Sequence, residues 1–134
     1  MTKIAIILRT LQLFGQNMHN LATGPSFFAD HDALSDFYTA AAFDYDTVVE
    51  RMIGLGQDVD LPKIPSKAAE NIAKLPVSES NNHALELILA LEKSLCREVE
   101  KEVASSVSEG TKQLIGEIAN KSEGRQYLLG QRLK

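Results

Sequence analysis

Two histidines and a run of carboxylates lie within residues 19–50, and these are the residue types in the chain that could do metal chemistry. The histidines are His19 and His31. The carboxylates of the same stretch are Asp30, Asp32, Asp36, Asp44, Asp46 and Glu50. Imidazole nitrogens and carboxylate oxygens together suit iron, zinc or manganese. Whether these groups can meet on one metal ion depends on how the chain places them.

A break at Gly24-Pro25-Ser26 separates the two histidines, and no glycine or proline follows it until Gly54. The pattern therefore predicts one long helix after the break. Because a helix rises about 1.5 Å per residue, His31 and Asp46 would lie about 22 Å apart along it, too far to share a metal ion. At about 100° per residue, however, both fall on one stripe of the helix, with Glu50 about 40° further round.

Two copies of this helix could build the site if they crossed antiparallel about a two-fold axis. His31 of one chain would then face Asp46 and Glu50 of the other, and the pairing would occur twice. Small residues at 39–42 would let the two backbones approach, and His19 could fold back beside His31 across the turn. The predicted metal ligands are therefore His19, His31, Asp46 and Glu50, the histidines from one subunit and the carboxylates from its partner. Four such ligands leave coordination positions open, which suits redox chemistry with oxygen or peroxide better than a closed structural zinc site.

The rest of the chain supplies the helices that must position this stretch. Apolar residues recur at helical spacing, without an alternating strand-like segment. The pattern predicts an all-α, ferritin-like four-helix bundle whose long connection between the second and third helices carries a short extra helix. Residues 1–134 are expected to form this single domain. The expected helices are Lys3 to Ala22 with Thr2 as its cap, Ser26 to Gly54 or Gly56, Ser66 to Leu75 in the connection, Asn81 to Ser105, and Glu109 to Arg132 with Ser106 or Ser108 as its cap.

Composition narrows the classes of function. The net charge of -4 argues against a general nucleic-acid surface, because such affinity comes mostly from Lys and Arg at phosphates. No apolar stretch approaches the roughly 20 residues of a membrane span. The first residues resemble a signal peptide but are interrupted by Arg9 and Gln12, so we expect a helix of the mature fold there. Cys96 is the only cysteine and cannot form a disulfide within the chain, which fits a reduced cytoplasm best.

Several residues recur at fixed spacings: His19 is followed by Gly24, Phe27 and His31, and then by Asp46, Glu50-Arg51 and Leu55-Gly56. Over residues 13–56 this pattern resembles the Dps family of mini-ferritins, and the rest of the chain resembles it in helix layout. The resemblance implies a hollow dodecamer built from two-fold dimers. It implies a ferroxidase, an oxidoreductase that oxidises ferrous iron, usually with hydrogen peroxide, at sites shared across the dimer interface. Iron would then be stored as ferric mineral, protecting against oxidative damage.

Carried over by position, the ligands that the resemblance implies are the same four residues, with zinc or manganese as substitutes for iron. Two positions depart from the family pattern. Ser35 stands where the family has an aspartate four residues after the second histidine, and Asn20 replaces a tryptophan. Asp36 is a candidate substitute for the missing carboxylate, although it points about 100° away from Ser35.

These departures leave an alternative function open: a Dps-like shell or DNA-protecting protein with weak or lost ferroxidase activity. DNA binding itself is not favoured, because the net charge is negative and the first helix is expected to start almost at Met1, without a basic tail. The acidic residues Asp30, Asp32 and Asp44 are interpreted as a solvated helix face.

Overall fold

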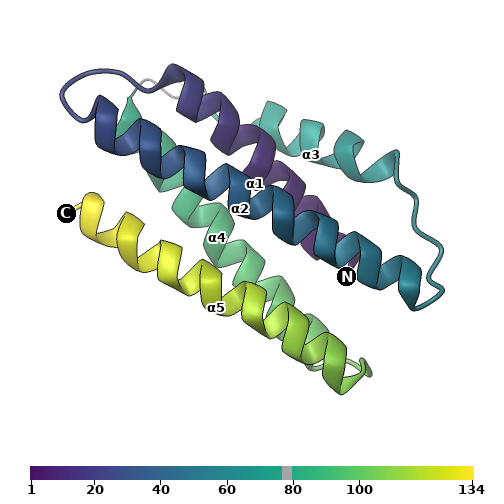
Figure 1. Ribbon diagram of the computed structural model, residues 1–134. Coiled ribbons are helices and arrows are strands. Elements are labelled where there is room, and N and C mark those ends of the chain that lie inside the picture. Colours follow the sequence, from purple (N-terminus) through teal and green to yellow (C-terminus); the bar gives the residue numbers. More distant parts are fainter. Residues whose placement is uncertain (77–79) are drawn as a thin grey trace.

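The computed structural model describes residues 1–76 and 80–134, and within these ranges the secondary structure is helical, without strands. The helices are α1 (Thr2–Leu21), α2 (Phe27–Gly54), α3 (Lys63–Lys74), α4 (Asn81–Val103) and α5 (Glu109–Arg132). The four long helices α1, α2, α4 and α5 form a bundle, and α3 lies in the crossover from α2 to α4 and packs on α1 (Figure 1). The predicted all-α bundle with a short helix in its long crossover is confirmed.

Helix α5 begins at Glu109 and ends at Arg132, as the sequence predicts, and the structure shows which of the two candidate serines caps it. Ser108 is the N-cap residue, and its hydroxyl oxygen accepts a hydrogen bond from the backbone N–H of Thr111 at 3.2 Å. The alternative cap, Ser106, lies outside the helix.

At the other end of the chain, the expected cap role of Thr2 is wrong, because α1 already begins at Thr2 and Met1 occupies the cap position.

The helix in the crossover begins earlier than its sequence suggested. We expected a start at Ser66, after Pro65, but α3 begins at Lys63. Pro65 therefore lies in the first turn, where a backbone N–H has no partner within the helix, so its missing N–H costs nothing. The expected start at Ser66 is wrong because Pro65 belongs to the first turn of α3 and does not precede the helix. At its C-terminal end α4 stops at Val103, two residues before the expected Ser105.

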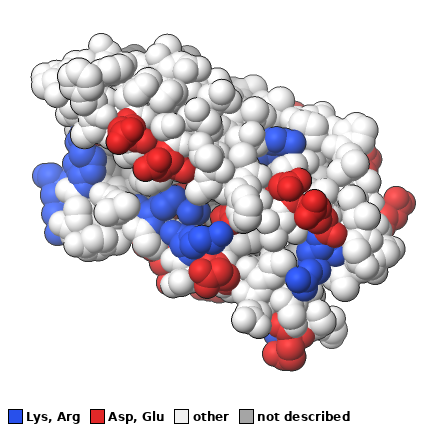
Figure 2. All heavy atoms as spheres, viewed as in Figure 1, with Lys and Arg blue, Asp and Glu red and all other residues white. Residues whose placement is uncertain are grey.

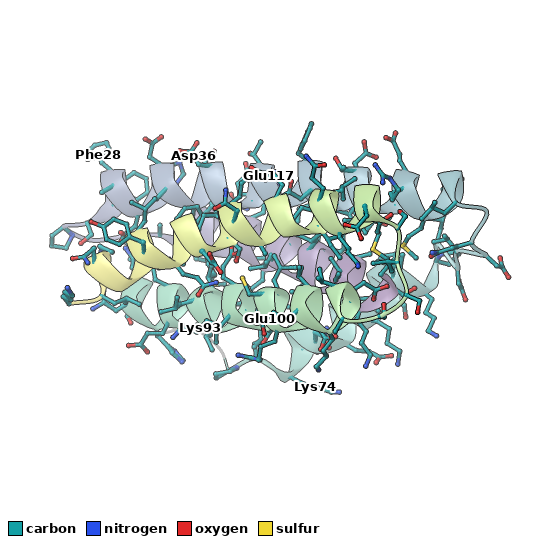
Figure 3. The ribbon with its side chains drawn as sticks, turned by 90° about the horizontal axis from the view of Figure 1, so that it is seen from below. Phe28, Asp36, Lys74, Lys93, Glu100 and Glu117 are labelled. Atoms are coloured by element: carbon teal, nitrogen blue, oxygen red, sulfur yellow. The ribbon has the colours of Figure 1, made fainter. Side chains whose placement is uncertain are left out.

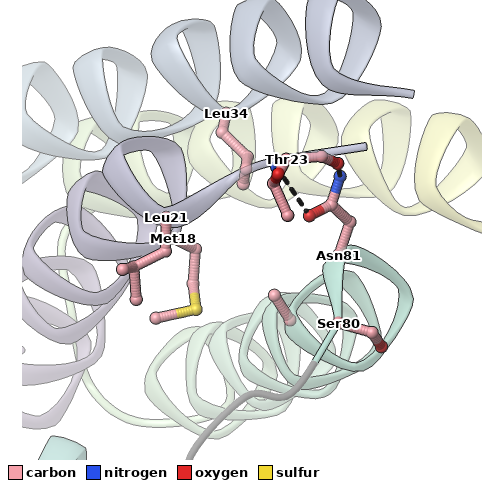
Figure 4. A pocket seen from close by; sticks show the side chains of 7 residues that line it. Met18, Leu21, Thr23, Leu34, Ser80 and Asn81 are labelled. Carbon is pink, nitrogen blue, oxygen red and sulfur yellow. Dashed lines mark hydrogen bonds between the residues drawn. The ribbon is translucent and has the colours of Figure 1, made fainter. Parts of the chain in front are cut away.

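The apolar core lies between the four long helices and is closed on one side by α3. Its largest fully buried apolar side chains are Ile4, Leu8, Leu34, Met52, Ile64, Leu85, Ile88, Leu95, Ile115 and Leu129. A cavity of about 60 Å³ remains where the end of α1 meets the start of α4. In Figure 4 it is bordered by Met18 and Leu34, while the backbone N–H of Thr23 donates to the Asn81 side chain at 3.2 Å. None of the helices in the described residues is long and apolar enough to cross a membrane.

Polar groups tie α2 to α5 along their length. Near the start of α2, Arg132 donates two hydrogen bonds to the Asp30 carboxylate, at 2.9 and 2.8 Å. Further along, Lys121 donates to Asp44 at 2.5 Å. Asp30 and Asp44 are 2% and 1% exposed, so their interpretation as part of a solvated face is wrong, whereas Asp32 is exposed as expected.

A second buried ion pair joins α4 to α5 in the interior of the bundle. Arg125 donates from Nε and Nη2 to the two carboxylate oxygens of Glu92, at 2.6 and 3.1 Å. The Ser122 hydroxyl donates to the same carboxylate at 2.5 Å. Glu92 is 1% exposed and Arg125 is 8% exposed, so this charge pair has left water almost completely.

Candidate metal centre

The turn between α1 and α2 brings the two predicted histidine ligands together. His19 lies in the last turn of α1, and His31 lies one turn after the start of α2. Gly24 has a φ of 82°, in the left-handed region that glycine adopts without a side-chain clash. The N–H of Phe27 donates to the Gly24 carbonyl at 3.0 Å and leads the chain into α2. The predicted folding back of His19 beside His31 is what this turn produces.

The two imidazole rings stack and hold each other through the backbone. Their centroids are 3.7 Å apart and their planes meet at 24°. Nδ1 of His19 lies 2.8 Å from the His31 carbonyl oxygen, and Nδ1 of His31 lies 3.0 Å from the His19 carbonyl oxygen. Because a carbonyl oxygen only accepts, both Nδ1 atoms must carry the proton that is donated. In the neutral rings, each Nε2 therefore keeps a free lone pair, which is the form of histidine that binds metals.

Aromatic side chains fix these rings from either side. The Tyr38 ring meets His19 edge-on, with centroids 5.4 Å apart, and the Phe27 ring lies 4.8 Å from that of His31. Gly15 lets α1 and α2 approach here, since a Cβ on it would lie 3.2 Å from the Cβ of Tyr38. The close packing that this glycine permits therefore sits one helical turn before His19.

The residue before His31 anchors the start of α2, a role that the sequence reasoning missed. Asp30 accepts hydrogen bonds from Arg132 and, at 3.0 Å, from the side chain of Asn81. Burial raises the pKa of the Asp30 carboxyl, but the hydrogen bonds from Arg132 and Asn81 and the charge of Arg132 outweigh it and lower the pKa below the usual 3.8. The signal was present in the spacing: Asp30 lies on the buried stripe of α2 with Leu34 and Ala41.

The two predicted carboxylate ligands lie on the outward face of α2. Asp46 and Glu50 are both exposed, and by the rise of the helix Asp46 is about 22 Å from His31. Figure 2 shows acidic side chains in two groups along α2, one toward each end, with a largely uncharged stretch between them. Among the residues that the structure describes, no three His, Cys, Asp or Glu side chains lie close enough together to hold a metal ion. One chain thus brings His19 to His31 but does not bring Asp46 or Glu50 to them.

The two positions that bear on the missing carboxylate differ in exposure. Ser35, where the family pattern has aspartate, is half-buried, one turn after His31. Asp36, the candidate substitute, is exposed, and Figure 3 shows it on the outward edge of α2, pointing away from the bundle. Asp36 therefore points in a different direction from Ser35.

The chain therefore has the fold of a ferritin-like four-helix bundle. In a comparison with solved structures the chain is similar to a mutant of Dps1 from Mycobacterium smegmatis, with a TM-score of 0.81. The match covers 99% of this chain and 91% of that one, at 16% sequence identity. No family model matches the sequence, and no curated protein matches it. At this identity the likeness establishes the fold, and the activity has to be argued from the residues.

Proposed function

We propose that this chain is a mini-ferritin that oxidises ferrous iron at a site completed only when two subunits pair. The observation that carries the proposal is the reciprocal hydrogen bonding of His19 and His31, which leaves both Nε2 atoms free as metal ligands. Here the backbone sets each ring in the tautomer that a metal ion needs.

The partner subunit supplies the carboxylates in this proposal. Asp46 and Glu50 are four residues apart on one exposed face of α2, and two adjacent carboxylates repel each other unless a cation lies between them. An antiparallel two-fold crossing of α2 sets these groups opposite His31 of the other subunit, once at each end of the helix pair. The donor set of imidazole nitrogen and carboxylate oxygen fits iron, with zinc or manganese as substitutes.

Iron is the substrate of the proposed reaction, and hydrogen peroxide is the oxidant. Two ferrous ions each lose one electron, and the peroxide takes up both electrons as its O–O bond breaks. With two water molecules, the products are two units of ferric oxyhydroxide and four protons. The histidine and carboxylate ligands hold the ions while leaving coordination positions open for the oxidant. A closed shell, a dodecamer by the family resemblance, would retain the ferric product as mineral.

A shell with weak ferroxidase activity is the second candidate, and Ser35 is the observation that favours it. Without a carboxylate one turn after His31, the site has one fewer anionic ligand and holds a second metal ion less firmly. A shell with weak ferroxidase activity could instead protect DNA by binding it. Retardation of DNA by the assembled protein in a low-salt gel would support it, against the unfavourable net charge of -4.

The test of the proposal is ferric product formation from ferrous iron and peroxide by the assembled protein. His31→Ala and Asp46→Ala should each lower the initial rate by about 10- to 100-fold, since each removes a ligand. His83→Ala is the matched control, because His83 lies in the first turn of α4 and is not one of the proposed ligands, so it should keep the wild-type rate. Zinc binding by calorimetry gives a second readout. Equal rates and equal zinc binding in wild type and both ligand variants would contradict the proposal.

A further inference from the structure

Phe28 is the most exposed large apolar side chain among the described residues. It is 86% exposed, although it lies in the first turn of a well-formed helix. Figure 3 shows it on the same outward edge of α2 as Asp36, directed away from the bundle. Its neighbour Phe27 packs against it at 5.5 Å between ring centroids and against His31 at 4.8 Å. Burial of this ring against a partner would remove a large apolar surface from water, which favours association.

A groove of about 430 Å³ lies at the opposite end of the same helix, between α2 and the N-terminal half of α5. It is lined by Thr47, Glu50, Arg51, Gly54, Leu55 and Leu114. Leu55 and Leu114 supply apolar walls, and the Arg51 guanidinium can lie against the face of an aromatic ring. No atom lies within 4 Å of where a Cβ on Gly54 would be, so the groove is open at this point.

The two-fold pairing in the proposed function brings this groove to Phe28 of the other subunit, so the inference rests on that proposal. If His31 faces the partner's Asp46 or Glu50, paired residue numbers sum to about 77–81. Phe28 then lies level with about residues 49–53 of the partner, which is where the groove lies.

The angular position of Phe28 also places it on the stripe that faces the partner. At about 100° per residue, Phe28 and Asp46 fall at the same angle round α2. Glu50, a wall of the groove, lies about 40° further round than Phe28. A two-fold crossing brings residues at similar angles together, so it carries Phe28 to the Glu50 side of the partner's groove.

We propose that Phe28 of each subunit inserts into the groove of its partner, so that two aromatic contacts flank the two metal sites. The occupant of the groove is a second copy of this chain. Because Glu50 is both a wall of the groove and a proposed metal ligand, the inserted ring also shields one side of the site from water. Phe28 is thus a positioning residue, which sets the register that places His31 opposite the partner's carboxylates.

Dimer dissociation on dilution, measured by analytical ultracentrifugation of the assembled protein, tests the contact from both sides. Phe28→Ala should weaken pairing by about 100-fold, because each dimer loses two buried phenylalanines. Gly54→Leu should weaken it similarly by filling the groove, without touching Phe28. Leu128→Ala, an apolar residue on α5 that is 56% exposed, is the control and should leave the dimer unchanged. Wild-type pairing in both test variants would overturn the inference.

A cross-linking experiment distinguishes this inference from the proposed function. In a Cys96→Ser background, Phe28→Cys and Gly54→Cys are introduced together and treated with a short bismaleimide. A covalent dimer supports the inserted contact, and the single variants define the background. If no covalent dimer forms while His31→Ala still lowers the rate of iron oxidation, the inference fails and the proposed function stands. If the dimer forms but the wild-type protein oxidises no iron, the inference stands and the proposed function fails.

Discussion

The Glu92–Arg125 pair gives the sharpest prediction about what holds the bundle together. Arg125→Met removes the cation and both of its hydrogen bonds, at 2.6 and 3.1 Å, and leaves the Glu92 carboxylate 1% exposed without a counter-charge. Breaking a buried pair from one side costs about 3–5 kcal/mol of unfolding free energy, because a charge is left in a medium of low dielectric constant. Ser122 still donates to Glu92 at 2.5 Å, but one hydroxyl cannot replace a charge. For a domain of this size we expect the melting temperature to fall by about 10–20 °C.

The double variant Glu92→Leu, Arg125→Met completes the thermodynamic cycle. It removes both charges and replaces them with apolar side chains of similar length, so it should cost less than either single variant, by about 2 kcal/mol or more. Ser122 keeps an acceptor in the backbone carbonyl of residue 92, at 3.2 Å, and is not stranded. Urea unfolding of all four proteins at one protomer concentration measures the cycle, since assembly adds to apparent stability. Single variants that cost less than about 1 kcal/mol, or a double variant that costs their sum, would refute the reasoning.

Three further predictions concern the surroundings of the candidate site. The lowered pKa of Asp30 means that its ion pair contributes stability at pH values above the unfolded-state pKa and loses it as pH falls through the folded-state pKa. The unfolding free energies of wild type and Asp30→Asn should therefore differ at neutral pH and converge as pH falls through the folded-state pKa of Asp30. The exposed Asp32→Asn should show no comparable difference. Gly15→Val should destabilise the protein by about 1–3 kcal/mol and lower its zinc affinity, because the new Cβ would lie 3.2 Å from the Cβ of Tyr38. Gly124→Val is the control and should show neither effect, because a Cβ there meets nothing within 4 Å. Equal urea midpoints for Gly15→Val and wild type would contradict this prediction. Ser35→Asp should raise the rate of ferrous iron oxidation by restoring a carboxylate one turn after His31, and an unchanged rate of ferric absorbance would show that Ser35 does not limit the reaction.

The helical layout could be predicted from sequence because apolar spacing and breaks are local signals. α5 begins and ends where its pattern placed it, at Glu109 and Arg132, and α2 ends at Gly54. The start of α3 was misplaced because Pro65 was treated as a break, although a proline is harmless in the first turn of a helix. Local rules thus predicted which elements exist better than where each begins.

The pairing of the two histidines was predicted from sequence, but its detailed geometry was not, and the four-ligand site stays a prediction. The spacing of His19 and His31 around the turn led to their pairing, because the reversal at Gly24 is encoded locally. The tautomers were not predictable, since each ring bonds to the backbone of the other helix. Asp30 and Asp44 were misread because residue type was given more weight than position, and their partners, Arg132 and Lys121, are distant in sequence.

Subunit complementation tests the central claim, a site shared between two chains, most directly. His31→Ala and Asp46→Ala should each keep no more than about a tenth of the wild-type rate by this account, and the two variants are co-expressed in equal amounts. About half of the dimers are then mixed, and each mixed dimer has one doubly defective site and one site with both wild-type residues, so about a quarter of the wild-type ferroxidase activity should return. If His31 and Asp46 acted within one chain, every chain would carry a defect. Activity no higher than that of either variant alone would contradict the account.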